Sequence, residues 1–368
     1  MGPSTGMTSI GIAQPFYKKD EEKDLMDSMN QTTSDAQYLN SFIRGMAISQ
    51  MLGVICEVEL PDTLHPDETC SIKSLAVKLG VDERVLLRVS RTLSAFGFFT
   101  IDVDGNIQHN SRSLMLRKGR YSSQHWAARF WTSPGVWGAW DELRHALRTG
   151  EEGFKQAHQK QFFDYMNTHT DEADTYRQYM ASGYPGRHEA VASILELDDV
   201  STVIDVGGGT GVLIRAILDK HPNVSGVVYD QSDVIRSVTA TQAYTSLNGR
   251  YTLLEGDFFT SVPEGGDVYV LSYVLHDWPD FKALEILRSC RRSMSPSSRL
   301  IIVERLINDN PAACDPFDLL LDINMLVLHA GQERTLSHFN LLMKAAGFSS
   351  VRLIRGQATF SVFEVLPV

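Results

Sequence analysis

Three glycines at alternate positions carry the clearest chemical signal in this sequence. Gly207, Gly209 and Gly211 follow an apolar segment at 203–206 and precede a segment of helical character at 212–220. Glycines between a strand and a helix let the backbone turn sharply, so that free N–H groups and the helix N-terminus come close to a ligand. The pattern indicates the cofactor-binding turn of a Rossmann-like βαβ unit.

The spacing narrows the kind of cofactor. Gly208 lies between the glycines of a G-x-G-x-G pattern, and Val212 stands where the dinucleotide fingerprint has its third glycine. A second apolar segment, 224–229, ends in Asp230, about 20 positions beyond the glycines, where a carboxylate can accept hydrogen bonds from a ribose. An Asp after a strand can also be a helix cap. The order of strand, glycine turn, helix, second strand and Asp230, together with the glycine spacing, favours a single-nucleoside cofactor such as S-adenosylmethionine.

A histidine follows the fourth predicted strand of this region. His276 lies in the segment Leu-His-Asp-Trp-Pro-Asp at 275–280. Ligands of open α/β sheets bind at the carboxyl ends of the strands, so His276 is expected at the reactive edge. The segment also reads as a helix start, with Asp277 or Asp280 as its cap and Pro279 in the first turn. The two interpretations are compatible.

An α/β domain must position these residues. From about residue 186 to the C-terminus, helical and extended segments alternate. Strands are expected at 203–206, 226–229, 251–255, 268–272, 300–303, 351–354 and 359–365. Residues 116–185 predict a helical connecting region rich in large aromatic side chains, most of them in a core or an interface and some in the lining of an apolar pocket.

The first part of the chain predicts a different architecture. Residues 1–33 are polar and charged and are expected to form a mobile arm. Residues 34–115 predict helix, turn, helix and hairpin, which is a winged-helix layout. The second helix, which starts near 82, carries mixed charges rather than a basic stripe. DNA binding is therefore disfavoured against a role in dimerisation or as a substrate lid.

Composition sets outer limits. The chain has 368 residues, enough for two domains, and its 43% hydrophobic and 21% charged content is ordinary for a globular protein. A net charge of −11 argues against nucleic-acid and anionic-membrane partners. We find no apolar run of about 18 residues, no secretory signal in residues 1–20 and no C-x-x-C pair. These features predict a cytoplasmic protein.

Taken together, these motifs resemble the small-molecule O-methyltransferases that use S-adenosylmethionine, the plant caffeate and chalcone type with bacterial and fungal relatives. The resemblance extends from about residue 35 to the C-terminus. It is carried by the segments 205–211, 255–259, 275–280, 302–305 and 331–335. It implies a homodimer, with a winged-helix dimerisation domain at 34–115 that closes part of the partner's active site. A Rossmann-like catalytic domain at 186–368 would follow.

The resemblance also assigns roles to residues. His276 matches the general base of the family, flanked by Glu304 and Glu333. The residues expected at the cofactor are Gly207, Gly208, Gly209, Gly211, Asp230, Asp257 and Phe258, with Asp257 bound to the adenine and Phe258 packed on it. The candidates for the acceptor pocket are Trp131, Met180, Tyr184 and Met325. The plant enzymes have a lysine where this chain has Ser272, so the contact made by that lysine is not carried over.

The expected reaction is methylation of a hydroxyl on an aromatic or polyketide-like small molecule. A phenol with a pKa of about 10 is mostly protonated at neutral pH, and an imidazole can take its proton as the methyl group moves. A carboxylate on the other ring nitrogen holds the tautomer. No metal is expected, because the helically spaced Asp315, Asp318 and Asp322 read as a helix face.

Two other functions remain open at this stage. Some fungal relatives keep the cofactor pocket but catalyse pericyclic or dehydrative steps, commonly with another residue at the position of the base. The intact His276 and both glutamates favour methyl transfer over that chemistry. A winged-helix regulator that senses S-adenosylmethionine would need a basic recognition surface, which the sequence does not show.

Overall fold

The structure is a computed structural model that describes residues 34–120, 122–182, 186–241, 249–356 and 360–368. The chain divides into two compact units, Met1–Leu52 and Gly53–Val368. The described part of the first unit is helical, with a helix over Ser34–Ile43 and the start of α2 (Gly45–Glu57). The arm predicted for residues 1–33 lies outside the described residues.

The helix at the start of the described chain has several exposed apolar side chains: Tyr38, Leu39, Phe42 and Ile43. Within the described residues, no single helix has the length and apolar character needed to cross a membrane. One bent pair, Ser34–Ile43 with Gly45–Glu57, meets those criteria by length and composition alone.

The second unit begins with helices and a small sheet, in which the two predicted helices and the hairpin are joined by a short helix and a strand that the sequence did not predict. The elements are α3 (Leu60–Thr63), β1 (Cys70–Ser71), α4 (Ile72–Leu79), α5 (Glu83–Ala95), β2 (Thr100–Ile101) and β3 (Asn106–Gln108). The antiparallel sheet has the order β1-β3-β2. The Ser71 hydroxyl caps α4, the αL residue Gly80 ends it, and the Asp82 carboxylate caps α5.

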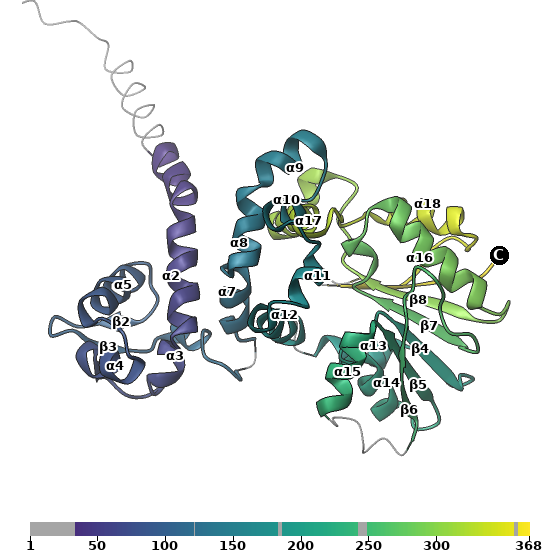
Figure 1. Ribbon diagram of the computed structural model, residues 1–368, viewed down its shortest axis with the longest axis horizontal. Coiled ribbons are helices and arrows are strands. Elements are labelled where there is room, and N and C mark those ends of the chain that lie inside the picture. Colours follow the sequence, from purple (N-terminus) through teal and green to yellow (C-terminus); the bar gives the residue numbers. More distant parts are fainter. Residues whose placement is uncertain (1–33, 121, 183–185, 242–248, 357–359) are drawn as a thin grey trace, which may run out of the picture. The chain divides into compact units, whose positions relative to one another are not determined.

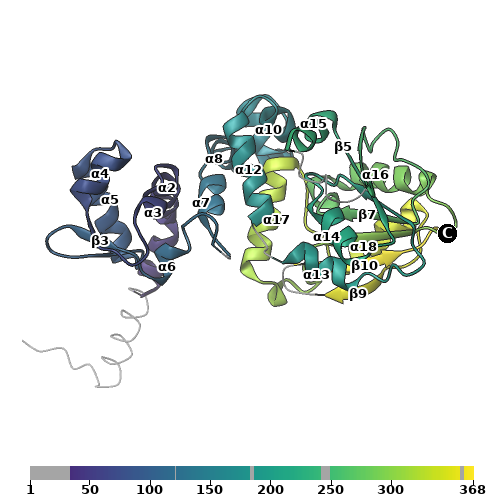
Figure 2. The same cartoon turned by 90° about the horizontal axis from the view of Figure 1, so that it is seen from below.

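Seven helices follow in the described residues, and the last six of them pack around an aromatic core. They are α6 (Ser111–Leu114), α7 (His125–Trp131), α8 (Pro134–Asp141), α9 (Leu143–Thr149), α10 (Gly153–His158), α11 (Phe162–Met166) and α12 (Thr170–Ser182). The buried rings of Phe130, Phe154 and Phe162 share this core with Val327 and Leu328. Those two residues belong to α17 (Pro316–His329), which lies among the teal helices α8–α12 in Figures 1 and 2.

A seven-stranded sheet forms the rest of the unit, in the order β6-β5-β4-β7-β8-β10-β9. Its strands are β4 (Thr202–Val206), β5 (Ser225–Asp230), β6 (Tyr251–Glu255), β7 (Val268–Ser272), β8 (Arg299–Glu304), β9 (Arg352–Gly356) and β10 (Ser361–Val365). The strands β4 to β8 pair in parallel, and β10 is antiparallel to both of its neighbours. The parallel-dominated α/β fold predicted from the sequence is confirmed.

Helices cover both faces of this sheet (Figure 1). They are α13 (Arg187–Ile194), α14 (Val212–Lys220), α15 (Ser232–Thr241), α16 (Asp280–Ser293) and α18 (Leu336–Ala346). Two short 3₁₀ turns, η1 (Leu275–Asp277) and η2 (Pro311–Ala313), lie in the connections. Strand side chains alternate between the faces. In β7, Tyr269 and Leu271 pack with α16 and α18, whereas Val268 and Val270 pack with α13 and α14. The parallel strands therefore present their carboxyl ends along one edge.

Candidate active site

The glycine turn joins β4 to α14 at that edge. Gly207, Gly209 and Gly211 have φ values of 72°, 56° and 75°, a left-handed conformation that side chains disfavour. Gly208 has a different reason to be glycine, because a Cβ there would come within 2.9 Å of the Asp205 carboxyl carbon. The turn therefore requires glycine, because of the backbone conformation at three of these positions and because of the neighbouring carboxylate at Gly208.

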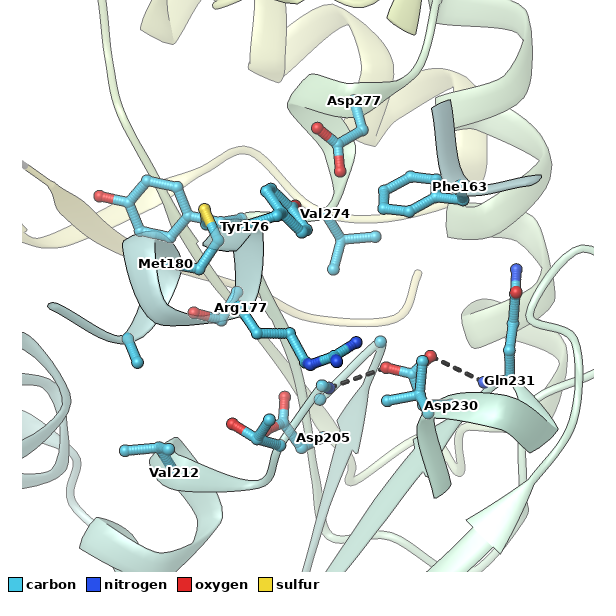
Figure 3. A pocket seen from close by; sticks show the side chains of 18 of the residues that line it. Phe163, Tyr176, Arg177, Met180, Asp205, Val212, Asp230, Gln231, Val274 and Asp277 are labelled. Carbon is cyan, nitrogen blue, oxygen red and sulfur yellow. Dashed lines mark hydrogen bonds between the residues drawn. The ribbon is translucent and has the colours of Figure 1, made fainter. Parts of the chain in front are cut away.

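Two carboxylates face the turn from the ends of neighbouring strands. Asp230 accepts hydrogen bonds from the backbone N–H groups of Gly209 and Gln231, both at 2.7 Å (Figure 3). Asp205 is almost fully buried, and its Oδ1 has no hydrogen-bond partner among the described residues. Burial, reinforced by the charge of Asp230, raises the pKa of Asp205 to about 7. The turn thus offers a buried acceptor that a polar ligand can satisfy.

A cavity of about 320 Å³ opens over this turn. Its lining includes Gly207, Gly208, Gly209, Asp230 and Phe258, five of the seven residues expected at the cofactor. In its upper part Phe163, Tyr176 and Met180 come from α11 and α12 (Figure 3). Arg177 of α12 extends its guanidinium toward Asp230. The cavity is therefore apolar on one side and charged on the other.

Two residues expected at the cofactor, Gly211 and Asp257, are not in the described lining of the cavity. Gly211 is the N-cap of α14, where a side chain would collide with the Tyr251 hydroxyl, and the described lining does not include it. The Asp257 carboxylate is exposed and accepts hydrogen bonds from the Phe259 N–H at 2.9 Å and the Thr260 hydroxyl at 3.0 Å. In this structure Asp257 stabilises a turn rather than facing the cavity.

The four acceptor-pocket candidates are also divided. Met180 lines the cavity, whereas the described lining does not include Trp131 or Met325. Trp131 instead packs against Phe130 and Trp140. Tyr184 lies outside the described residues.

The structure brings His276, Glu304 and Glu333 together. His276 Nδ1 is 3.3 Å from Glu333 Oε1 and 3.5 Å from Glu304 Oε2. All three residues are buried. Burial alone would lower the pKa of His276, but the surrounding carboxylates, Glu304 foremost, outweigh burial and raise the pKa to about 10. The cluster therefore favours the protonated imidazole and holds its Nδ1 side fixed.

Glu304 fixes the backbone that carries the histidine. It is the last residue of β8, and its Oε1 accepts the backbone N–H groups of Val274 at 3.1 Å, Leu275 at 2.8 Å and His276 at 3.3 Å. These bonds satisfy the start of η1, which otherwise has no side-chain cap. One carboxylate thus positions both the turn and the ring.

The segment that follows α17 is fastened to the same turn. The N–H of Gln332 donates to the His276 carbonyl at 2.9 Å, and a Cβ on Gly331 would collide with that carbonyl. The buried Arg334 donates to the carbonyls of Leu275 and Trp278, both at 2.7 Å. These contacts set the separation between His276 and Glu333.

Replacing Arg334 with Leu is expected to lower the free energy of unfolding by about 3–5 kcal/mol, because the carbonyls of Leu275 and Trp278 and the Asp280 carboxylate each lose a charged donor. Urea denaturation followed by tryptophan fluorescence measures this change. The matched control is Arg288→Leu on the exposed face of α16, for which we expect little change. Equal stability of the two variants would contradict the proposal that the hydrogen bonds of Arg334 hold this segment to the turn.

Sequence reasoning missed three contributors to the site. Asp277 was considered only as a helix cap, yet it lines the cavity, and its Oδ1 is 3.4 Å from His276 Nε2. The same oxygen is 3.7 Å from Nε2 of His329, whose ring stacks on Phe163. The spacing of Arg177 and His329 carries no motif, because both reach the site through tertiary packing.

Comparison with known proteins identifies the chain. Residues 140–349 match the family model described as an O-methyltransferase domain. The chain belongs to this O-methyltransferase family. S-adenosylmethionine is the cofactor of the family, so the cofactor predicted from the sequence agrees with the classification.

The relatives extend over nearly the whole O-methyltransferase chain. It is 34% identical to a phenazine O-methyltransferase of Lysobacter antibioticus, over 90% of this chain and 96% of that protein. The solved mitomycin 7-O-methyltransferase has a TM-score of 0.86 and 29% identity, over 92% of this chain and 100% of that one. An O-methyltransferase from neocarzinostatin biosynthesis was solved with S-adenosylmethionine and 2-hydroxy-5-methyl naphthoic acid. Its structure matches with a TM-score of 0.76 and 26% identity, over 88% of this chain and 96% of that one.

Proposed function

We propose that this O-methyltransferase methylates a hydroxyl group on an aromatic or polyketide-like secondary metabolite, with His276 as the general base. The observation that carries the proposal is the buried contact of His276 Nδ1 with Glu304 and Glu333, one residue from the cavity-lining Asp277. The names of the relatives support the substrate class, since phenazine and naphthoic acid are flat aromatic molecules.

The residues of the cavity fit the cofactor. We assign Asp230 to bind the ribose and Phe258 to pack on the adenine ring. Gly207 and Gly208 let the backbone come close to the cofactor. Arg177 is the cation placed to pair with the carboxylate of the amino-acid part. When bound, S-adenosylmethionine supplies an electrophilic methyl group. Asp257 and Gly211 are not in the described lining of the cavity, so their contact with the cofactor stays a prediction.

The side chains at the edge of the cavity carry out proton transfer. In its neutral form, His276 accepts the hydroxyl proton of the acceptor at Nε2 while its Nδ1–H donates to the Glu333 carboxylate. Glu304 and Glu333 then stabilise the imidazolium that forms. Phe163, Tyr176 and Met180 supply the apolar wall that holds a flat acceptor.

We extend the proposal to the other parts of the chain. Residues 34–115 are proposed to form a homodimer interface, which the exposed apolar side chains near Phe42 support. Residues 116–185 are proposed to line the acceptor pocket, which Phe163 and Met180 support.

Mass spectrometry of the purified protein with S-adenosylmethionine and a panel of phenolic and polyketide acceptors tests the function. We expect a product heavier by one methyl group and an equal amount of S-adenosylhomocysteine. Conversion of an acceptor without S-adenosylhomocysteine would contradict methyl transfer and support the pericyclic or dehydrative alternative.

The activity is expected to rise with pH above neutrality. The carboxylates raise the pKa of His276 from 6.5 to about 10, so the protonated ring prevails at pH 7 and the base form grows as pH increases. Therefore kcat/KM is expected to rise by up to about tenfold per pH unit and to level off as pH approaches that pKa.

The Glu333→Gln variant separates the ionisation of the enzyme from that of the acceptor. It removes a charge that raises the pKa of His276, so the rise in kcat/KM is expected at lower pH, although the acceptor is unchanged. Coincident pH profiles of the two proteins would assign the rise to the acceptor and contradict the role of His276.

A further inference from the structure

The three side chains of the catalytic cluster also have the chemistry of a metal-binding site. His276, Glu304 and Glu333 each offer one ligand atom, and the three atoms lie within 4.8 Å of one another. We propose that this trio binds a divalent transition-metal ion, best matched by Zn²⁺, and that the bound ion inhibits methyl transfer. The binding stands on its own, whereas the inhibition rests on the proposed function.

The distances suit a tetrahedral ion. Zn²⁺ bonded at about 2.0–2.2 Å in tetrahedral geometry places its ligand atoms about 3.3–3.6 Å apart. His276 Nδ1 is 3.3 Å from Glu333 Oε1 and 3.5 Å from Glu304 Oε2. The imidazole is therefore spaced from each carboxylate as tetrahedral ligands are, and the ligand atoms of the two carboxylates lie within 4.8 Å of each other. A fourth position is left for water.

Unsatisfied carboxylate oxygens give independent support for a ligand. Glu304 is fully buried and Glu333 nearly so. Glu304 Oε2 faces His276 Nδ1 at 3.5 Å without a hydrogen bond, and Oε2 of Glu333, whose Oε1 contacts the same nitrogen, has no hydrogen-bond partner among the described residues. Buried acceptors without a donor are costly. A divalent ion between two carboxylates and a neutral imidazole gives a cluster with no net charge, which a single proton on His276 cannot do.

The surroundings of the trio are suited to orienting its ligands. Oε1 of Glu304 accepts hydrogen bonds from three backbone N–H groups, which leaves its Oε2 directed toward His276. The backbone N–H of Glu333 donates to Asp322 Oδ1 at 2.8 Å. Such outer contacts fix ligand orientation in metal sites.

Glu333 also lines a second hollow. Asp322, Gly331 and His338 line it as well, and its described lining shares no residue with that of the cofactor cavity. An ion that enters this hollow need not pass through the cofactor cavity.

The proposed inhibition follows from the tautomers of imidazole. An ion bound at Nδ1 of neutral His276 leaves the ring proton on Nε2. That is the nitrogen to which the acceptor must donate in the proposed mechanism. The ring then has no lone pair for the acceptor proton, so an ion at this site blocks the base without touching the cofactor cavity. Imidazole favours Zn²⁺ and Co²⁺ over Mg²⁺, which predicts selectivity.

Binding is tested first, on the full chain and without any assay of activity. Chelator-treated protein is titrated with ZnCl₂ by calorimetry and with CoCl₂ by visible absorption. We expect one site per chain, intense Co²⁺ bands typical of tetrahedral coordination, and no response to MgCl₂. The absence of a one-to-one site, or weak octahedral Co²⁺ bands in the wild-type protein, would overturn the proposal.

Variants locate the site. Glu333→Gln and Glu304→Gln are expected to weaken Zn²⁺ binding by at least about tenfold. The control is His65→Ala, which removes an exposed histidine that faces Glu68 at 4.0 Å and is an alternative surface site. Loss of the Zn²⁺ signal in His65→Ala, with full binding in Glu333→Gln, would overturn the assignment. The Co²⁺ spectrum of wild-type protein remains decisive if a variant fails to fold.

Activity is tested second. Methyl transfer by the wild-type protein is expected to fall as the Zn²⁺ site fills and to recover with chelator. Loss of activity on chelation with recovery on adding Zn²⁺ would overturn inhibition and make the ion an activator. If the protein transfers no methyl group at all, the proposed function fails while the binding experiments still decide the site.

Discussion

Replacing His276 with Ala is expected to lower kcat for methyl transfer by about 10²–10⁴-fold, the range for loss of a general base. The affinity for S-adenosylmethionine is expected to be unchanged, because the described lining of the cofactor cavity includes Asp277 but not His276. Steady-state kinetics and calorimetric titration with the cofactor measure the two quantities.

The control for this variant is His65→Ala, which removes an exposed histidine far from the site in the sequence and is expected to keep full activity. An unchanged kcat in the His276→Ala protein would show that His276 is not the general base. A variant that loses cofactor affinity and activity together would show that His276 supports the cavity rather than the chemistry.

Replacing Asp230 with Ala is expected to weaken cofactor binding while changing kcat little, the reverse of the pattern expected for His276→Ala. We expect the Kd for S-adenosylmethionine to rise by about 10- to 100-fold, because hydrogen bonds to a charged group contribute about 1.5–3 kcal/mol each. At saturating cofactor, kcat is expected to change much less, since Asp230 is assigned to the ribose. Calorimetric titration and cofactor-dependent kinetics give both values.

Asp230 also accepts the N–H of Gly209, so its removal affects the glycine turn. Asp230→Asn keeps one acceptor oxygen and is expected to lose less affinity than Asp230→Ala. Asp219→Ala, an exposed residue that pairs with Arg215, is the control with no expected effect. Unchanged cofactor affinity in Asp230→Ala would contradict the assignment of the ribose.

Much of this fold follows from local patterns in the sequence. The glycine turn, the strand before it and Asp230 are close together in the chain, and each has a local physical reason for its residue type. The continuous apolar run in β7 likewise indicates a strand buried on both faces. Such features survive folding because neighbours in the sequence determine them.

Contacts between distant segments could not be predicted in the same way. Residues 276 and 333, which are 57 positions apart, come together because contacts of Arg334 and Gly331 hold their two loops together. The role that the resemblance gives Asp257 at the adenine stays a prediction, because its carboxylate accepts hydrogen bonds within its own turn and is not in the described lining of the cavity. His329 reaches the site only because α17 packs among the aromatic helices.

The most direct test of the central claim varies the acidity of the acceptor. Rates of methyl transfer by the wild-type and His276→Ala proteins are compared for one acceptor scaffold bearing increasingly electron-withdrawing ring substituents. If His276 removes the hydroxyl proton, the ratio of the two rates is predicted to fall toward one as the pKa of the acceptor drops below the assay pH. A ratio that stays large and constant across the series would contradict the role of His276 as the base.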